Sequence, residues 1–166
     1  MTKNLGSAAT FKVLNKLAGP GGMNANLGAL TQSERDLAGV IESSQVRAQN
    51  AAADIAERVL GAKYPAVNVY CEKIVNELKE KFRTFAGTAQ MAIEIRQSQD
   101  RLEGLQDRLE LYADAVMQSL NGSRGDWGDG MFYTGEYEVA FGPVKQGGKN
   151  FMQVAKVTFE IGVSRN

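Results

Sequence analysis

The C-terminal end of the chain contains two long stretches in which apolar and polar residues alternate. The first covers residues 131–141 and the second covers residues 151–163, and both are rich in aromatic and β-branched side chains. Because successive side chains of a strand point to opposite faces, this alternation predicts two strands that each bury one face. Residues 143–148 begin with a proline and end in two glycines, which is the composition of a hairpin turn. The upstream chain is therefore expected to cover the apolar face of this hairpin.

Length and charge limit the possible classes of protein. With 166 residues, of which 43% are apolar and 23% charged, the chain fits one globular domain with its own core. Nineteen basic residues balance 19 acidic residues, so overall charge favours neither nucleic acid nor a membrane surface. A ring-shaped assembly would still be able to concentrate one sign of charge in its bore. No run approaches the roughly 18 apolar residues of a membrane helix, and the N-terminus lacks a hydrophobic signal region, so neither a membrane span nor secretion is expected.

Side chains that commonly perform catalysis are scarce. The absence of histidine removes the commonest general base and the commonest metal ligand. Cys71 is the single cysteine, so no disulfide can form within the chain, and a buried structural thiol in a reducing compartment is expected. Glu136 and Glu138 are expected to face solvent or the cations of a partner, although an acid/base pair there is the enzyme alternative. The expectation is a protein that is not an enzyme.

Two glycine-rich segments resemble ligand-binding loops only in part. Asp126 and Asp129 lack the further oxygen ligands of a calcium loop, so a turn stabilised by the aspartate side chains is expected. Residues 147–148 lie beside Lys145 and Lys149, but no phosphate-loop pattern and no following helix accompany them. No catalytic residue, cofactor site or metal site is therefore expected.

Residues 1–30 are predicted to form a flexible N-terminal arm. They are rich in glycine, asparagine and alanine, and the Gly-Pro-Gly-Gly sequence at residues 19–22 interrupts any helix. A short amphipathic turn is expected around Phe11 and Leu14. Either this terminus frays, or the arm becomes ordered against a neighbouring subunit.

Two long helices are predicted in the upstream chain. The first covers residues 32–60 and has a thin, alanine-rich apolar stripe. The second covers residues 102–120, where apolar residues recur at steps of three and four. The expected capping pairs are Thr31 with Glu34 or Ser33 with Asp36 for the first helix, and Asp100 with Glu103 for the second.

Two further strands are predicted over residues 64–73 and 88–99, where apolar and polar residues alternate again. Residues 74–85 between them fit either a helical turn or a long solvated connection, and Leu78, Phe82 and Phe85 are expected to hold this segment against the protein. The predicted order is helix, strand, strand, helix, strand, strand. This order favours an α+β fold over residues 31–166, with a four-stranded, mostly antiparallel sheet covered by two long helices.

Besides this order of elements, three stretches of sequence are distinctive. They are Tyr-Pro-Ala-Val-Asn-Val-Tyr at residues 64–70, Ala-Ile-Glu-Ile-Arg at residues 92–96 and Lys-Val-Thr-Phe-Glu-Ile at residues 156–161. Together they resemble the tail terminator and head–tail joining (neck) proteins of long-tailed bacteriophages, over roughly residues 32–166. Members of that family form a hexameric ring that stops growth of the tail tube and joins it to the head connector, with DNA passing through the bore.

The resemblance implies a structural virion protein at the head–tail junction, assembled in the host bacterial cytoplasm. The implied partners are other copies of the chain, expected as a hexamer, together with the tail tube protein, a head-completion or connector protein and double-stranded DNA in passage. No membrane partner is implied, and the family contributes no catalytic residues. A tail terminator and another neck protein both remain open, because the arm and the first helix look larger than a minimal terminator needs.

The function is expected to lie in surfaces at the two ends of the ring. The predicted contact segments are the arm, the glycine-rich loop over residues 121–130 and the hairpin turn. Their candidate interface residues are Trp127, Lys145, Gln146, Lys149, Phe11 and Leu14. For Trp127 the alternative is packing over the end of its own sheet. The alternative function is a cellular oligomeric adaptor that binds a partner through the helix at residues 102–120.

Overall fold

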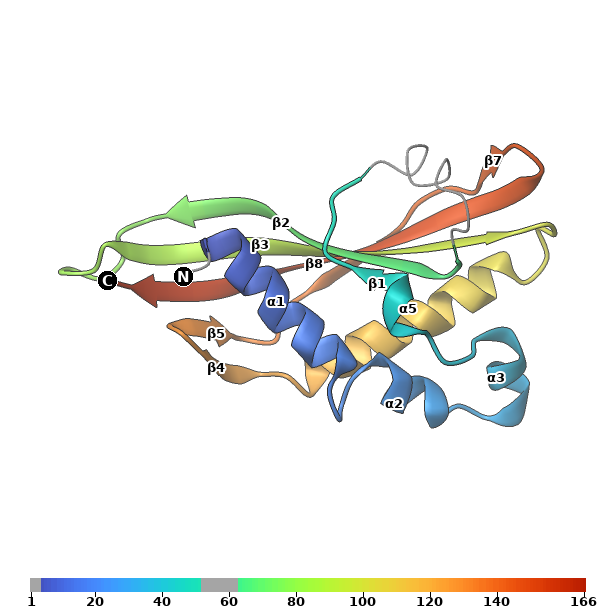
Figure 1. Ribbon diagram of the computed structural model, residues 1–166, viewed down its shortest axis with the longest axis horizontal. Helices are drawn as coiled ribbons and strands as arrows, with labels where there is room; N and C mark the ends of the chain where they lie inside the picture. Colours follow the sequence, from blue (N-terminus) through green and yellow to red (C-terminus); the bar gives the residue numbers. More distant parts are fainter. Residues whose placement is uncertain (1–3, 52–62) are drawn as a thin grey trace.

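The computed structural model describes residues 4–51 and 63–166, and its sheet is built around three long strands (Figure 1). They are β2 (Ala66–Asn76), β3 (Phe85–Gln99) and β8 (Asn150–Arg165). β3 lies between the other two and is antiparallel to both, and it pairs with β8 from Phe85↔Arg165 to Gln99↔Phe151. The strands predicted over residues 64–73, 88–99 and 151–163 are therefore confirmed as β2, β3 and β8.

Three short strands share the outer edge of β8. They are β5 (Met131–Tyr133), β6 (Glu138–Phe141) and β7 (Lys145–Gly147), and each is antiparallel to β8. Gly135, with φ 103°, lies in the break between β5 and β6. Pro143, which has no backbone N–H to donate to a ladder, lies in the break between β6 and β7. The first alternating stretch is therefore an interrupted strand.

The sheet has eight strands, which corrects the prediction of four. β4 (Gly125–Gly128) extends the sheet beyond β5, and β1 (Val46–Arg47) adds to β2 in parallel. The strand order is β1-β2-β3-β8-β5-β4, with β6 and β7 also paired to β8. The sequence pattern underestimates the number because the predicted strand over residues 131–141 is divided at Gly135 into β5 and β6, and because β7 lies within the predicted turn. Strands as short as β1 and β4 also have no visible alternation.

Two helices cover one face of this sheet, α1 (Leu5–Ala18) and α5 (Leu105–Asn121) (Figure 1). α1 lies on β2 and β3, whereas α5 lies on β3 and β8. The apolar stripe predicted for the second helix is confirmed. Its buried members are Leu105, Leu109, Tyr112, Val116 and Leu120.

The predicted start of that second helix is wrong. α5 begins after Gly104, whose φ of 76° belongs to the left-handed region that favours glycine. Asp100 and Glu103 therefore lie before the helix and form no capping box with it, and Leu102 is exposed.

The first predicted helix is much shorter than expected. α3 (Gln32–Leu37) does start at the predicted capping box of Thr31 and Glu34, but it ends after six residues. A 3-10 turn, η1 (Ser43–Gln45), and then β1 follow it. Gly39 disfavours continuation of the helix, and the alanine-rich stripe offers little apolar area to bury. The part of the prediction over residues 52–60 lies outside the described residues.

The N-terminal segment is also different from the expected arm. Residues 5–28 form α1 and α2 (Met23–Gly28), and α1 is capped by Asn4, whose side chain accepts from the Ser7 amide at 2.8 Å. These helices contribute to the core the buried residues Ala9, Val13, Leu17, Met23 and Leu27. The structure therefore places this segment within the domain, because its few apolar residues fall on one helical face.

The core lies between these helices and the covered face of the sheet. Apolar side chains of α1, α2 and α5 meet there with those of β2, β3 and β8 in one cluster. α2 packs on α5, where the Asn26 side chain donates to the Ala115 carbonyl at 3.4 Å. Within the described part of the chain, no helix is both long enough and apolar enough to cross a membrane.

Candidate functional site

The second face of the sheet has no helix on it among the described residues, and we call it the helix-free face (Figure 1). β2, β3 and β8 alternate between core residues and residues on this face. Most of the latter are polar or charged, in contrast to the core. They include Asn68, Tyr70, Glu72, Gln90, Glu94, Arg96, Lys156, Thr158 and Glu160.

A network of polar contacts occupies the centre of the helix-free face. The Tyr70 hydroxyl donates to Oε1 of Glu94 at 2.6 Å. The other oxygen of that carboxylate, Oε2, lies 2.7 Å from Nη2 of Arg96. Nζ of Lys156 lies 6.0 Å from the centroid of the Tyr70 ring and forms an ion pair with Glu72. Glu94 thus accepts one neutral and one charged donor, which fixes its orientation.

The ion pair between Lys156 and Glu72 crosses the middle strand of the sheet. Glu72 belongs to β2 and Lys156 to β8, so their side chains span β3. Ala92 of β3, which pairs with Tyr70 and Thr158, is fully buried, although no helix among the described residues covers it. The long side chains therefore shield the backbone of β3 with their methylene groups while their charges remain at the surface.

Burial raises the pKa values of Tyr70 and of the adjacent Cys71. Burial, followed by the hydrogen bond to Glu94, raises the pKa of Tyr70 well above its ordinary value, so the phenol stays protonated at neutral pH. Burial also raises the pKa of the neighbouring Cys71 thiol, whose Sγ lies 3.6 Å from the Lys73 carbonyl oxygen. A protonated, half-buried thiol agrees with the predicted structural role of Cys71.

At one end of the helix-free face the chain itself lies against the network. Arg96 is only 3% exposed and donates from Nη2 to both Glu94 and the Ala51 carbonyl. The neighbouring buried Asn68 accepts from Nε2 of Gln49 at 3.1 Å. Nε and Nη1 of Arg96 have no hydrogen-bond partner among the described residues. Residues 49–51 therefore contact this end of the face, and at its centre Tyr70 and Ala92 are buried while the side chain of Lys156 is 38% exposed.

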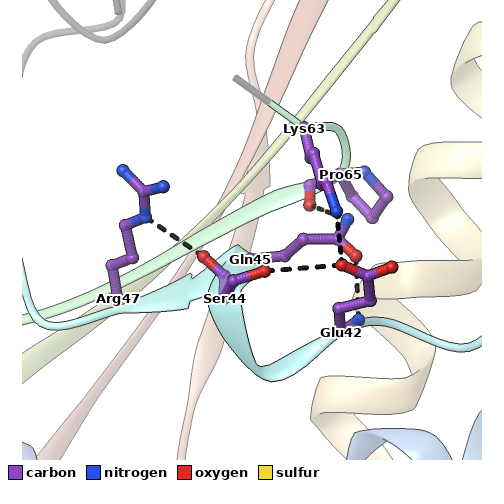
Figure 2. Close-up of polar contacts among 6 residues, drawn as sticks. All are labelled: Glu42, Ser44, Gln45, Arg47, Lys63 and Pro65. Carbon is purple, nitrogen blue, oxygen red and sulfur yellow. Dashed lines mark hydrogen bonds and ion pairs between the residues drawn. The ribbon is translucent and has the colours of Figure 1, made fainter. Parts of the chain in front are cut away.

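A second group of polar contacts joins the segment before β1 to the start of β2 (Figure 2). The carboxylate of Glu42 forms a 2.6 Å ion pair with Lys63, which lowers the pKa of that carboxyl. Nε2 of Gln45 donates to the Pro65 carbonyl at 2.8 Å. All these groups except Gln45 and Pro65 are well exposed, so the ion pair adds little stability. The contacts align β1 beside β2 and offer no pocket for chemistry.

The predicted interface residues fall into separate places. Lys145, Gln146 and Lys149 are exposed on β7 and its turn, at one end of the long axis (Figure 1). The turn is tighter than predicted, because Gly147 pairs with Asn150. Phe11 and Leu14 lie on α1, away from that turn, with Phe11 48% exposed and Leu14 half-buried. The structure therefore does not bring the predicted residues into one surface.

Trp127 packs against its own sheet, which was the alternative stated for it. It is 6% exposed, and its Nε1 donates to the Ser123 carbonyl at 2.6 Å. Its ring centroid lies 5.4 Å from that of Tyr133, and Nζ of Lys16 lies 5.7 Å from it. In this chain the indole is a core group that closes the end of the sheet.

Of the two aspartates near Trp127, Asp126 stabilises its turn, as predicted, whereas Asp129 pairs with Lys12 of α1. Oδ1 of Asp126 accepts from the Gly128 amide at 2.8 Å, and Oδ2 of Asp129 forms a 3.1 Å ion pair with Lys12. Across residues 4–51 and 63–166, no group of three or more His, Cys, Asp or Glu side chains is placed to hold a metal ion.

An exposed apolar tip at the loop between β2 and β3 was not predicted. Leu78 and Phe82 are exposed there, so the expectation that they hold this segment down is wrong, whereas Phe85 does pack against the core. The loop extends beyond the end of the sheet, where no helix of the described residues reaches it (Figure 1). The exposure of Leu78 and Phe82 could have been predicted from the high density of charged residues around them, which is typical of a solvated loop. The charged residues are Glu77, Lys79, Glu80, Lys81 and Arg83.

Comparison with protein-family models and with curated proteins found no match for this chain. The site must therefore be interpreted from its geometry. Its groups are paired charges, a protonated phenol and exposed apolar side chains at the ends of the molecule. Such groups form contact surfaces with other macromolecules.

Proposed function

We propose that this protein is a non-catalytic structural subunit of a ring at the head–tail junction of a tailed bacteriophage. There the ring caps the tail tube and joins it to the head connector while DNA passes through. Virion location, a homo-oligomer expected to be a hexamer, and contacts with the tube and connector proteins are parts of the same proposal.

One observation carries this proposal. The three stretches that resemble tail terminators are distant in sequence but adjacent in the sheet, because Tyr70 pairs with Ala92 and Glu94 pairs with Lys156. They meet at the network of Tyr70, Glu94, Arg96 and Lys156 on the helix-free face. The resemblance therefore lies in three adjacent strands, and the residues of these stretches that face away from the core meet at this network, which supports a shared role for them.

The charges of the helix-free face fit a surface past which DNA slides. Lys156 and Arg96, the cations at its centre, are both paired with glutamates. Tight nonspecific binding of DNA requires cations that are available to phosphates, and each such contact adds affinity. With its central cations neutralised and Glu160 exposed beside them, the face offers little hold on a phosphate backbone. We propose that this face is turned towards the bore.

The adaptor alternative is less well supported. An adaptor helix would present its apolar stripe to a partner, but the stripe of α5 is buried against β3 and β8. The remaining surface of α5 is polar, as on any helix that covers a core.

Particle size and shape test the ring. Light scattering and negative-stain images of the purified protein should show one discrete species several times 18.0 kDa, with a central opening. Monomers alone over a wide range of concentration would contradict the proposal.

DNA retention tests the orientation of the face. The unaltered ring should bind duplex DNA weakly and without sequence preference. Glu160→Lys, on the helix-free face, should strengthen DNA binding and steepen its salt dependence. Glu110→Lys, which makes the same charge change on the exposed side of α5, is the matched control and should have a smaller effect. Equal effects of the two variants would mean that the helix-free face does not line the bore.

A further inference from the structure

The tip of the β2–β3 hairpin, residues 77–84, presents two apolar side chains to solvent. Phe82 is 99% exposed and Leu78 is 61% exposed. Single exposed apolar residues are ordinary, but two on one short loop at the end of the long axis form an apolar knob (Figure 1). We call residues 77–84 the tip.

The tip is held in this shape by the side chain of Asn76. Its Oδ1 accepts from the amides of Leu78 at 3.3 Å and Ala86 at 3.0 Å, and its Nδ2 donates to the Thr84 carbonyl at 3.1 Å. Leu78 and Phe82 have φ values of 50° and 68°, a backbone region that bulky residues rarely adopt. The hydrogen bonds at the base of the loop maintain this conformation, so the knob is pre-organised for a partner.

The same chain carries a hollow of about 370 Å³ with a mostly aliphatic lining. It lies between α1, α2 and residues 41–46, and we call it the α1–α2 hollow. Leu17, Met23 and Ile41 are buried at its wall, and Ala18 is exposed at its edge. A further hollow, lined by Lys12 and Lys16 among others, is more polar.

We propose that the tip of one copy inserts Phe82 into the α1–α2 hollow of the next copy. This inference rests on the proposed ring and identifies one contact within it. A knob and a hollow at different places on one chain make a head-to-tail contact, which generates a ring when the rotation between copies closes. A tip at the end of the long axis cannot reach the hollow beside α2 in its own chain (Figure 1).

Charge also matches this contact with a second copy. Lys81, next to Phe82, forms no ion pair among the described residues, whereas Lys79 and Arg83 pair within the tip with Glu77 and Glu80. The hollow is bordered by Glu42, whose side chain is 62% exposed even in its pair with Lys63. A tip seated in the hollow brings the unpaired cation towards this carboxylate.

Truncation of the knob provides the first test. Phe82→Ala should weaken self-association by about tenfold or more, measured as the subunit dissociation constant, because a buried aromatic anchor is a frequent hot spot. Phe141→Ala removes an exposed aromatic group from β6, at 40% exposure, and is the matched control. An unchanged dissociation constant for Phe82→Ala would overturn the proposal.

Crosslinking provides the second test and distinguishes head-to-tail contacts from tip-to-tip contacts. In a Cys71→Ser background that keeps Phe82, the protein with both Arg83→Cys and Ala18→Cys should give a ladder of covalent multimers with a short thiol crosslinker. Each single-cysteine protein should remain uncrosslinked, and a mixture of the two should give dimers only. Dimers of the Arg83→Cys protein alone would show that tips meet each other, and would overturn the proposal.

The two proposals fail in different ways. Rings in the images, without crosslinks between positions 83 and 18, would overturn the tip contact and leave the proposed function standing. Monomers under all conditions would overturn both.

Discussion

Two hairpins at the same end of the molecule each carry an aromatic residue, which is buried in one hairpin and exposed in the other. In the β4–β5 hairpin Trp127 is 6% exposed, whereas at the tip of the β2–β3 hairpin Phe82 is 99% exposed. Both hairpins have a residue other than glycine at positive φ, Asp129 and Phe82, so local backbone shape does not separate them. The difference is what lies nearby: Lys16 of α1 and Tyr133 lie against the indole, whereas no helix of the described residues reaches the tip. An aromatic residue therefore becomes core or contact surface according to its neighbours.

The largest expected effect is the loss of the buried aromatic group. Trp127→Ala should lower the free energy of unfolding by about 3–5 kcal/mol, because it leaves a cavity beside Tyr133 and removes the bond to Ser123. Urea denaturation followed by circular dichroism measures this without the tryptophan signal. Trp127→Phe, which keeps a ring, should cost less. If the free energy of unfolding is unchanged while joining of tails to heads fails, Trp127 is an interface residue and the contrast with Phe82 is wrong.

The same contrast is expected within one predicted apolar stripe. Leu109 is fully buried under α5, whereas Leu102, assigned to the same stripe from sequence, is 56% exposed before the helix. Leu109→Ala should cost about 2–5 kcal/mol and Leu102→Ala within about 0.5 kcal/mol. Equal losses would mean that residues 100–104 pack on the core.

A third effect concerns Tyr133, the aromatic ring next to Trp127, and the loss of stability appears only at alkaline pH. Burial, as the largest cause, raises the pKa of Tyr133 to about 12, above the value of about 10 in an unfolded chain. The folded state therefore holds this proton more tightly. The resulting stability is complete below about pH 10 and is lost as the pH rises through the folded pKa.

Urea midpoints between pH 8 and pH 11.5 measure this effect. Tyr133→Phe should reduce the decline in stability above pH 10, but it should not abolish it, because burial also raises the pKa values of Tyr70 and Tyr112. A variant whose decline is as steep as that of the unaltered protein would show that Tyr133 ionises freely.

The smallest expected effect on folding is at the exposed tip. Phe82→Ala should change the free energy of unfolding of the subunit by no more than about 0.5 kcal/mol, because the ring makes no contact that folding creates. Denaturation at concentrations where the protein is dissociated is the appropriate measurement. A loss near 2 kcal/mol would show that the ring packs on its own chain, and would remove the contrast with Trp127.

The features that could be predicted from the amino-acid sequence are those with a local physical cause. Alternation identified β2, β3 and β8, because the strand period is a property of neighbouring residues. The stripe of α5 followed from the helical period, and the capping box of Thr31 and Glu34 followed from hydrogen bonds within one turn. In each case the residues that decide the structure lie within a few positions of one another.

Which of these elements share a surface depends on tertiary contacts and could not be predicted from the sequence. Residues 19–22 are rich in glycine and predicted a flexible arm, but α1 and α2 on either side of them complete the core. The pairing that brings Tyr70, Glu94 and Lys156 together depends on contacts between strands remote in sequence. The exposure of Phe82 and the burial of Trp127 depend on what covers each hairpin end. Burial is set by everything that packs around a side chain, and no local pattern of residues contains that information.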